Sequence, residues 1–215
     1  MLNTVERAIE LRPGLWQWLA HHPTWKRDVA SYLVVANGDV VLIDPLAPQG
    51  EAAPAFWRAL DAATASRKRL TVLLTVPDHA RSTAAIAGRY PEAAVYTAAR
   101  RRRKSLEGVD ALPLEPTAKL PAGIRAFETS RADERAIWIE PHRALVVGDV
   151  LLGTAEGGLR VCPEDWLPRR ATRSTVAAAL DALPLLDIDL VLPTHGDPPA
   201  DSRAALTAAI AEARS

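Results

Sequence analysis

The sequence has little cysteine and no excess of charge. Cys162 is its only cysteine among 215 residues, which excludes a disulfide framework within the chain and any C-x-x-C zinc or redox motif. Its 26 basic side chains balance 26 acidic ones, so the formal net charge is zero. A protein that binds nucleic acid through a basic surface would carry a strong excess of Lys and Arg. The charge balance therefore argues against a nucleic-acid partner.

Long hydrophobic runs are also missing. The longest apolar stretches have the length of strands, too short to span a membrane, and the first residues lack the apolar core of a signal peptide. Apolar residues make up 48% of the chain and charged residues 24%, which is typical of globular proteins. We therefore expect a cytoplasmic protein with a small-molecule ligand and no membrane partner.

The hydrophobic pattern predicts strands clustered early in each half of the chain, with helices after them. Asn37-Gly38 lies between two apolar runs and is typical of a hairpin turn. Expected strands cover 15–19, 29–36, 40–43, 70–76, 94–97, 124–129, 136–140, 144–147, 159–162 and 190–192, and expected helices cover 51–66, the segment up to 90, 174–186 and 201–214. This order predicts an α/β fold in which two sheets pack together with helices outside, as one domain over residues 1–215.

Residue types that bind metals follow three of the apolar strands. They are Asp78-His79, Asp149 and His195, and each lies next to proline or glycine. Carboxylate oxygens and imidazole nitrogens together suit Zn²⁺, Mn²⁺ or Fe²⁺. The residues are far apart in the sequence, so only the fold could bring them together.

The same segments, in order, resemble the metallo-β-lactamase superfamily. They are VASYLVVANGDVVLIDP, LLTVPDH before a helix, ALVVGDVLLG and VLPTHGDP, and the resemblance extends from about Leu15 to Pro198. It implies a four-layer αββα sandwich and, in most members, a metal-dependent hydrolase. It also places Asp44, at the end of a strand, as a structural carboxylate that supports the site.

The chain departs from the family at one of two metal sites. Asp78 and His79 match the end of the family's H-x-H-x-D-H loop, Asp149 matches the bridging aspartate, and His195 matches the last histidine. The two earlier histidines have no counterpart, whether the loop is aligned without a gap, at Leu74 and Val76, or with a deletion. The stretch 128–133 likewise lacks the third histidine.

The departure has a consistent pattern, because the first metal site is lost and the four ligands of the second remain. The resemblance thus implies one divalent ion, Zn²⁺ or else Mn²⁺ or Fe²⁺, bound by Asp78, His79, Asp149 and His195. Water activated by the ion, and oriented by Asp78 as catalytic residue, would cleave an ester, thioester, lactone or phosphoester.

Two other interpretations stay open. The scaffold could have lost its metal and could serve as a non-catalytic ligand-binding or interaction module. Asp78 would then cap the following helix, Asp149 would cap a turn, and His195 would be an ordinary loop histidine. A metal-free lyase or isomerase that uses His79 as acid or base is the other interpretation.

Three more residues are candidates for binding the substrate. The Arg81 guanidinium could supply positive charge beside the incomplete metal site and hold an anion. Cys162 and Trp166 follow the strand that carries Asp149 and could lie near the same cleft, although a lone cysteine is also a common small buried hydrophobe. The tryptophan-rich start of the chain, with Trp16 and Trp18, offers a surface for a homodimer.

Overall fold

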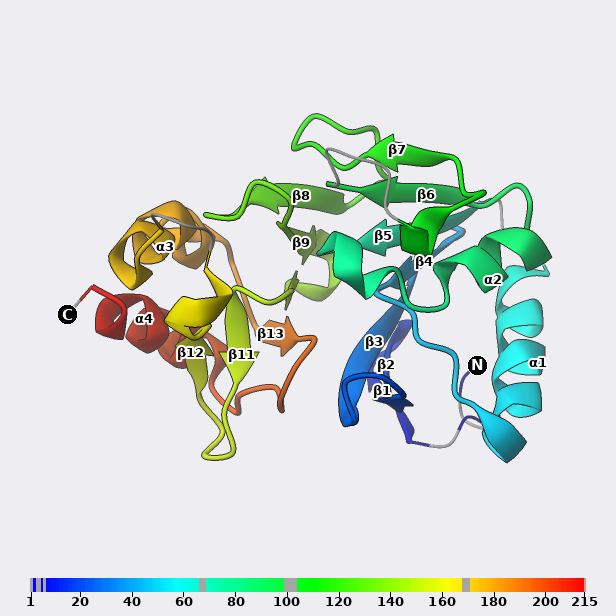
Figure 1. Ribbon diagram of the computed structural model, residues 1–215, viewed down its shortest axis with the longest axis horizontal. Coiled ribbons are helices and arrows are strands. Elements are labelled where there is room, and N and C mark those ends of the chain that lie inside the picture. The colour runs from blue at the N-terminus through cyan, green and yellow to red at the C-terminus, as the bar shows by residue number, and fades with distance from the viewer. Residues whose placement is uncertain are drawn as a thin grey trace. The chain divides into compact units, whose positions relative to one another are not determined.

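The computed structural model describes residues 2, 5, 7–65, 69–98, 104–167 and 171–214. The chain divides into two compact units, Met1–Pro113 and Leu114–Ser215. Each unit contains a β-sheet and helices, so the predicted α/β class is confirmed (Figure 1). The prediction of one domain over residues 1–215 stays a prediction.

The first unit is built on a seven-stranded sheet in the order β1-β2-β3-β4-β5-β6-β7. The strands are β1 (Ala8–Arg12), β2 (Leu15–His22), β3 (Arg27–Ala36), β4 (Asp39–Ile43), β5 (Leu70–Leu74), β6 (Ala94–Thr97) and β7 (Ala111–Pro113). Strands β1 to β4 pair antiparallel, and β4 to β7 pair parallel. Because β4 and β5 are parallel, the segments that follow them start at the same edge of the sheet.

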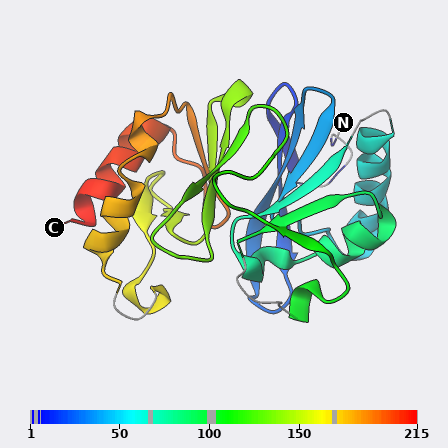
Figure 2. The same cartoon turned by 90° about the horizontal axis from the view of Figure 1, so that it is seen from above.

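Two helices cover one face of this sheet. They are α1 (Ala53–Thr64), between β4 and β5, and α2 (Thr83–Arg89), between β5 and β6 (Figures 1 and 2). Phe56 and Leu60 of α1 and Ile86 of α2 are buried in the same hydrophobic cluster as alternate residues of the strands. Alternation follows from strand geometry, in which successive side chains point to opposite faces.

Trp16 and Trp18 belong to this hydrophobic core, with 3% and 0% of their surface exposed. The Trp18 indole N–H donates a hydrogen bond to the Leu46 carbonyl at 2.8 Å, and its ring lies 5.5 Å from that of Phe56. These two rings therefore stabilise the first unit and offer no surface to a second copy of the chain.

The second unit has a four-stranded sheet in the order β13-β10-β9-β8 and a two-stranded sheet of β11 and β12. The strands are β8 (Ile124–Glu128), β9 (Arg135–Ile139), β10 (Ala144–Val147), β11 (Leu151–Gly153), β12 (Leu159–Val161) and β13 (Leu190–Pro193). Helices α3 (Arg173–Leu180) and α4 (Ser202–Glu212) lie side by side and share a core with them (Figure 2). Strands β10 and β13 pair parallel, so their carboxyl ends meet at one edge.

Most predicted elements are present, with two corrections. The short strands β1, β7 and β11 were not expected. The helix predicted over 174–186 ends at Leu180, because Pro184 lacks the N–H that a continuing helix needs, and a short 3-10 turn over Leu183–Leu185 follows. Among the described residues, no helix is both long and apolar enough to cross a membrane.

Candidate metal centre

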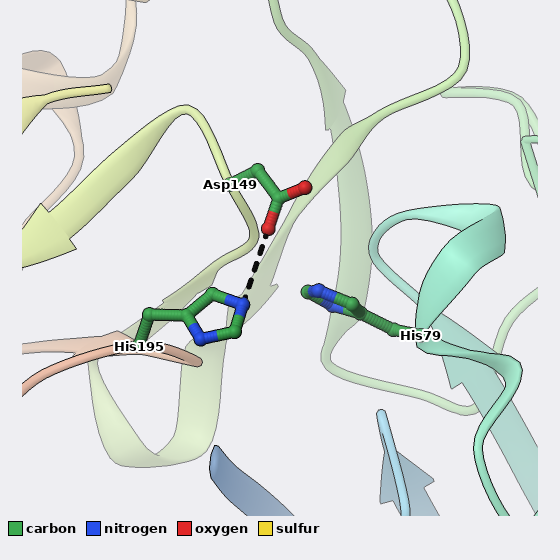
Figure 3. Close-up of side chains that lie close together, drawn as sticks. All are labelled: His79, Asp149 and His195. Carbon is green, nitrogen blue, oxygen red and sulfur yellow. Dashed lines mark ion pairs between the residues drawn. The ribbon is translucent and has the colours of Figure 1, made fainter. Parts of the chain in front are cut away.

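His79 lies in the first unit, on a short 3-10 turn, Pro77–Ala80, that follows β5 (Figure 3). Its side chain is 1% exposed. The ring Nδ1 donates a hydrogen bond to Asp44 Oδ2 at 2.9 Å and lies 3.2 Å from Thr75 Oγ1. A carboxylate that accepts from Nδ1 fixes the tautomer and directs Nε2 away from it, which is how metal-binding histidines are commonly held.

Asp44 follows β4 and is fully buried. Its carboxylate also accepts hydrogen bonds from the Thr75 backbone N–H, at 2.8 Å, and from the Thr75 hydroxyl. The residue has φ of +48°, in the left-handed region that Asp and Asn tolerate better than most residues. The parallel pairing of β4 and β5 thus brings Asp44 and Thr75 together, and the pair holds His79.

Asp78, predicted as a metal ligand and catalytic residue, is exposed, although it is the direct neighbour of His79. The carboxylate that accepts the hydrogen bond of the His79 ring is that of Asp44. Asp78 does not cap the next helix either, because α2 begins after Ser82. The orientation of His79 therefore comes from a residue at the end of another strand.

Arg81 anchors the same turn. One guanidinium nitrogen, Nη1, donates to the backbone carbonyls of Ala30, at 2.8 Å, and Asp44, at 2.7 Å. The guanidinium also lies 5.9 Å from the centre of the Trp25 ring, which stacks on His22 and meets the edge of His79. Two bonds to carbonyls give Arg81 a structural role in the first unit.

Asp149 and His195 lie together in the second unit. Each follows its strand, β10 or β13, by two residues, so the parallel pairing places both at one edge of the sheet. Asp149 Oδ1 lies 3.3 Å from His195 Nε2, and the two side chains are 16% and 11% exposed (Figure 3). The predicted pairing of these two residues through the fold is therefore present.

Two glycines let the His195 segment pass close to β11. The Gly153 N–H donates to the His195 carbonyl at 2.9 Å. Gly196 has φ of +79°, and a Cβ there would lie 2.2 Å from the Gly153 oxygen. A side chain at Gly153 would meet the backbone of Asp197 at 2.1 Å. Glycine at both positions therefore sets where His195 lies.

Arg131 is a site residue that the sequence did not single out. Its Nη1 lies 3.5 Å from Asp149 Oδ2, and its Nε lies 3.3 Å from Glu134 Oε2. Glu134 is fully buried, and its other oxygen accepts a hydrogen bond from the Val150 N–H at 2.8 Å. The available signal was the absence of histidine in the stretch 128–133, where an arginine stands.

Trp166 and Cys162 differ in their access to Asp149 and His195. The half-buried Trp166 ring meets the His195 ring edge to face, with 6.4 Å between their centres. Cys162 is fully buried in the core of the second unit, and burial raises the pKa of its thiol to about 11. Trp166 is thus placed to contact a ligand near His195, whereas Cys162 has the surroundings of a small core residue.

The donor atoms fit a divalent metal ion. Zn²⁺ binds carboxylate oxygen and imidazole nitrogen, and the second unit places one of each 3.3 Å apart. In the first unit, His79 Nδ1 is hydrogen-bonded to Asp44, so His79 Nε2 is the nitrogen that can bind a metal. The chemistry of these side chains agrees with the ligand types that the sequence predicted.

Comparison with solved structures finds the same fold in proteins of low sequence identity. A metallo-beta-lactamase family protein from Thermus thermophilus is 21% identical, with a TM-score of 0.65 over 94% of this chain and 80% of that one. The DIM-1 metallo-beta-lactamase is 13% identical, with a TM-score of 0.66 over 96% of each chain. A metallo beta lactamase from Erythrobacter litoralis is 14% identical, with a TM-score of 0.63 over 97% and 93%. No protein-family model and no curated protein matches the sequence.

Proposed function

Because the chain has the metallo-β-lactamase fold, we propose that it is a hydrolase that uses one divalent metal ion, Zn²⁺ in the first instance. The ion would be held by Asp149 and His195, which lie together in the second unit, and by His79 as the family resemblance implies. Asp78, which is exposed, is the fourth ligand that the sequence predicts. The substrate would be an ester, thioester, lactone or phosphoester.

The observation that supports this proposal most is the pairing of Asp149 with His195. An oxygen and an imidazole nitrogen lie 3.3 Å apart at the ends of two parallel strands. In α/β proteins, ligands gather at the carboxyl ends of parallel strands. His79 also follows a strand of a parallel pair, and the buried Asp44 fixes its ring.

The chain's own residues have distinct parts in this proposal. A bound ion supplies a Lewis acid that polarises the scissile group and activates water. Asp44 keeps the proton of His79 on Nδ1, so that Nε2 is available as a ligand. Trp166 offers an apolar ring beside His195 against which a substrate can pack.

Metal content per chain tests the proposal. The protein would be purified without a polyhistidine tag or chelator after growth with added Zn²⁺, Mn²⁺ and Fe²⁺, and its metal counted by mass spectrometry. We expect about one ion per chain, lost in His195→Ala and in Asp149→Ala. His21→Ala is the matched control, because His21 is an exposed histidine that also pairs with an aspartate, Asp28.

An activity screen follows the metal count. Hydrolysis of model esters, thioesters, lactones and phosphoesters would be compared between the wild type and His195→Ala. If the wild type binds no ion even after Zn²⁺ is added, the proposal is wrong.

One observation favours a second function, a metal-free ligand-binding module. Arg131 already places a positive charge 3.5 Å from Asp149, so that this carboxylate has a partner without any ion. In that case the wild type would bind no metal, and Asp149→Ala and His195→Ala would fold with unchanged ligand binding. Thermal-shift screening of small anions would then identify the ligand.

A further inference from the structure

The two oxygens of the Asp149 carboxylate face different partners. Oδ1 lies 3.3 Å from His195 Nε2, and Oδ2 lies 3.5 Å from Arg131 Nη1. The carboxylate therefore has one side that faces an imidazole nitrogen, a possible metal ligand, and another that faces a permanent cation, because a guanidinium stays protonated in proteins.

Arg131 also forms an ion pair with a second carboxylate. Glu134 is fully buried, with Oε2 3.3 Å from Arg131 Nε and Oε1 hydrogen-bonded to the backbone N–H of Val150, the residue after Asp149. Arg131 itself is 14% exposed. A buried carboxylate is stable only with a partner, so Glu134 and Arg131 hold each other beside Asp149.

A carboxylate that bridges two metal ions gives one oxygen to each ion. Here a guanidinium lies at one of the two oxygens, and that side already has a charge of +1. A dication at the same oxygen would have to displace the guanidinium from Asp149 and from Glu134. At Oδ1, which faces His195, an ion would not have to displace Arg131.

We propose that Arg131 is a positioning residue that takes the place of a second metal ion and thereby limits this centre to one. This proposal rests on the proposed function for the ion at Oδ1, whereas the guanidinium at Oδ2 is observed within the second unit. The centre would then bind one ion because the Arg131 guanidinium occupies the second position, in addition to the absence of the family's other histidines.

The consequence is specific for the substitution Arg131→His. Removing the guanidinium leaves Asp149 Oδ2 and Glu134 Oε2 as two carboxylate oxygens that faced the same cation. An imidazole at position 131 would add a nitrogen. Two oxygens and one nitrogen form a set that Zn²⁺ accepts, with water as a fourth ligand.

The experiment measures Zn²⁺ stoichiometry by titrating the metal-free protein in a calorimeter, with mass spectrometry under native conditions as a second count. We expect Arg131→His to bind one ion more than the wild type. Arg131→Lys, which keeps the positive charge, should bind the same number as the wild type. Arg160→His is the matched control, because it adds a histidine at an exposed position of β12 and should also leave the number unchanged.

The difference in bound Zn²⁺ between Arg131→His and the wild type separates this proposal from the proposed function. If the wild type binds one ion and Arg131→His two, both stand. If the wild type binds none and Arg131→His one, the hydrolase proposal fails and the role of Arg131 stands. If Arg131→His folds, as judged by circular dichroism, and binds no more Zn²⁺ than the wild type, the role of Arg131 is refuted. A wild type that binds two ions refutes it as well, whether or not the variants fold.

Discussion

Replacing Asp44 by Asn tests how the first unit holds His79. The amide has nearly the shape of the carboxylate, and Asn tolerates the positive φ of this position. The carboxylate accepts three hydrogen bonds, from the Thr75 N–H, the Thr75 hydroxyl and His79 Nδ1. An amide oxygen can keep one of them, whereas the NH₂ group faces the other two as a donor.

The magnitude follows from these three bonds. A hydrogen bond to a charged group contributes about 1.5–3 kcal/mol, and one between neutral groups about 0.5–1.5 kcal/mol. The Thr75 hydroxyl can turn to accept, and His79 can accept at Nδ1 if its proton moves to Nε2. We therefore expect Asp44→Asn to fold, with the free energy of unfolding lower by about 1–3 kcal/mol.

The change of tautomer has a larger effect on metal binding. An Nε2 that carries a proton cannot coordinate an ion, so we expect the affinity for Zn²⁺ to fall about 10–100-fold. Urea unfolding measures the stability, calorimetric titration the affinity, and nitrogen NMR of the imidazole the tautomer. Asp61→Asn is the control, since Asp61 also accepts hydrogen bonds from several donors, on Arg89 and Tyr90, but at the surface of the same unit. A folded Asp44→Asn with the proton still on Nδ1 and unchanged Zn²⁺ affinity would refute the reasoning.

Three further predictions concern the packing of each unit. Gly196→Ala should lower the free energy of unfolding by about 2–4 kcal/mol, because its Cβ would meet a carbonyl and φ is positive. Gly157 also has positive φ but has open space around it, so Gly157→Ala should lower the free energy of unfolding by about 1 kcal/mol. Chemical denaturation of both variants measures the difference. Trp18→Ala should cost about 3–5 kcal/mol in the same assay, and a loss below about 1 kcal/mol would contradict its place in the core. Cys162 should react with a thiol reagent at pH 8 only after denaturant is added, since burial raises its pKa to about 11. Because its pKa is higher in the folded state, its contribution to stability is complete below the ordinary thiol pKa and falls as the pH rises toward 11; Cys162→Ala should remove that part of the pH dependence.

Most elements could be predicted because their signals are local. The apolar runs of β3 and β4 and the Asn37-Gly38 turn between them are adjacent in the sequence, and the structure pairs them in register. The strands that were not predicted have weaker patterns. β1 has no buried residue and is a strand because β2 provides its hydrogen-bond partners, and β7 and β11 have three residues each.

The metal-binding residue types were also visible, since aspartate and histidine after an apolar strand are a local pattern. Their partners were not. The neighbour of His79 in the sequence, Asp78, is exposed, and the carboxylate on its ring comes from Asp44, 35 residues earlier. Arg131 pairs with Asp149, which lies on another loop.

The sequence alone determined the α/β class, most strand positions and the resemblance that the comparisons confirm for the fold, because hydrophobic periodicity and turn residues act over a few positions. Only the tertiary structure decided which charges meet. Hydrogen bonds and ion pairs form between atoms a few ångströms apart, and parallel strand pairing brings together loops that the sequence separates. Asp44 thus holds His79, and Arg131 lies at one oxygen of Asp149 while His195 lies at the other.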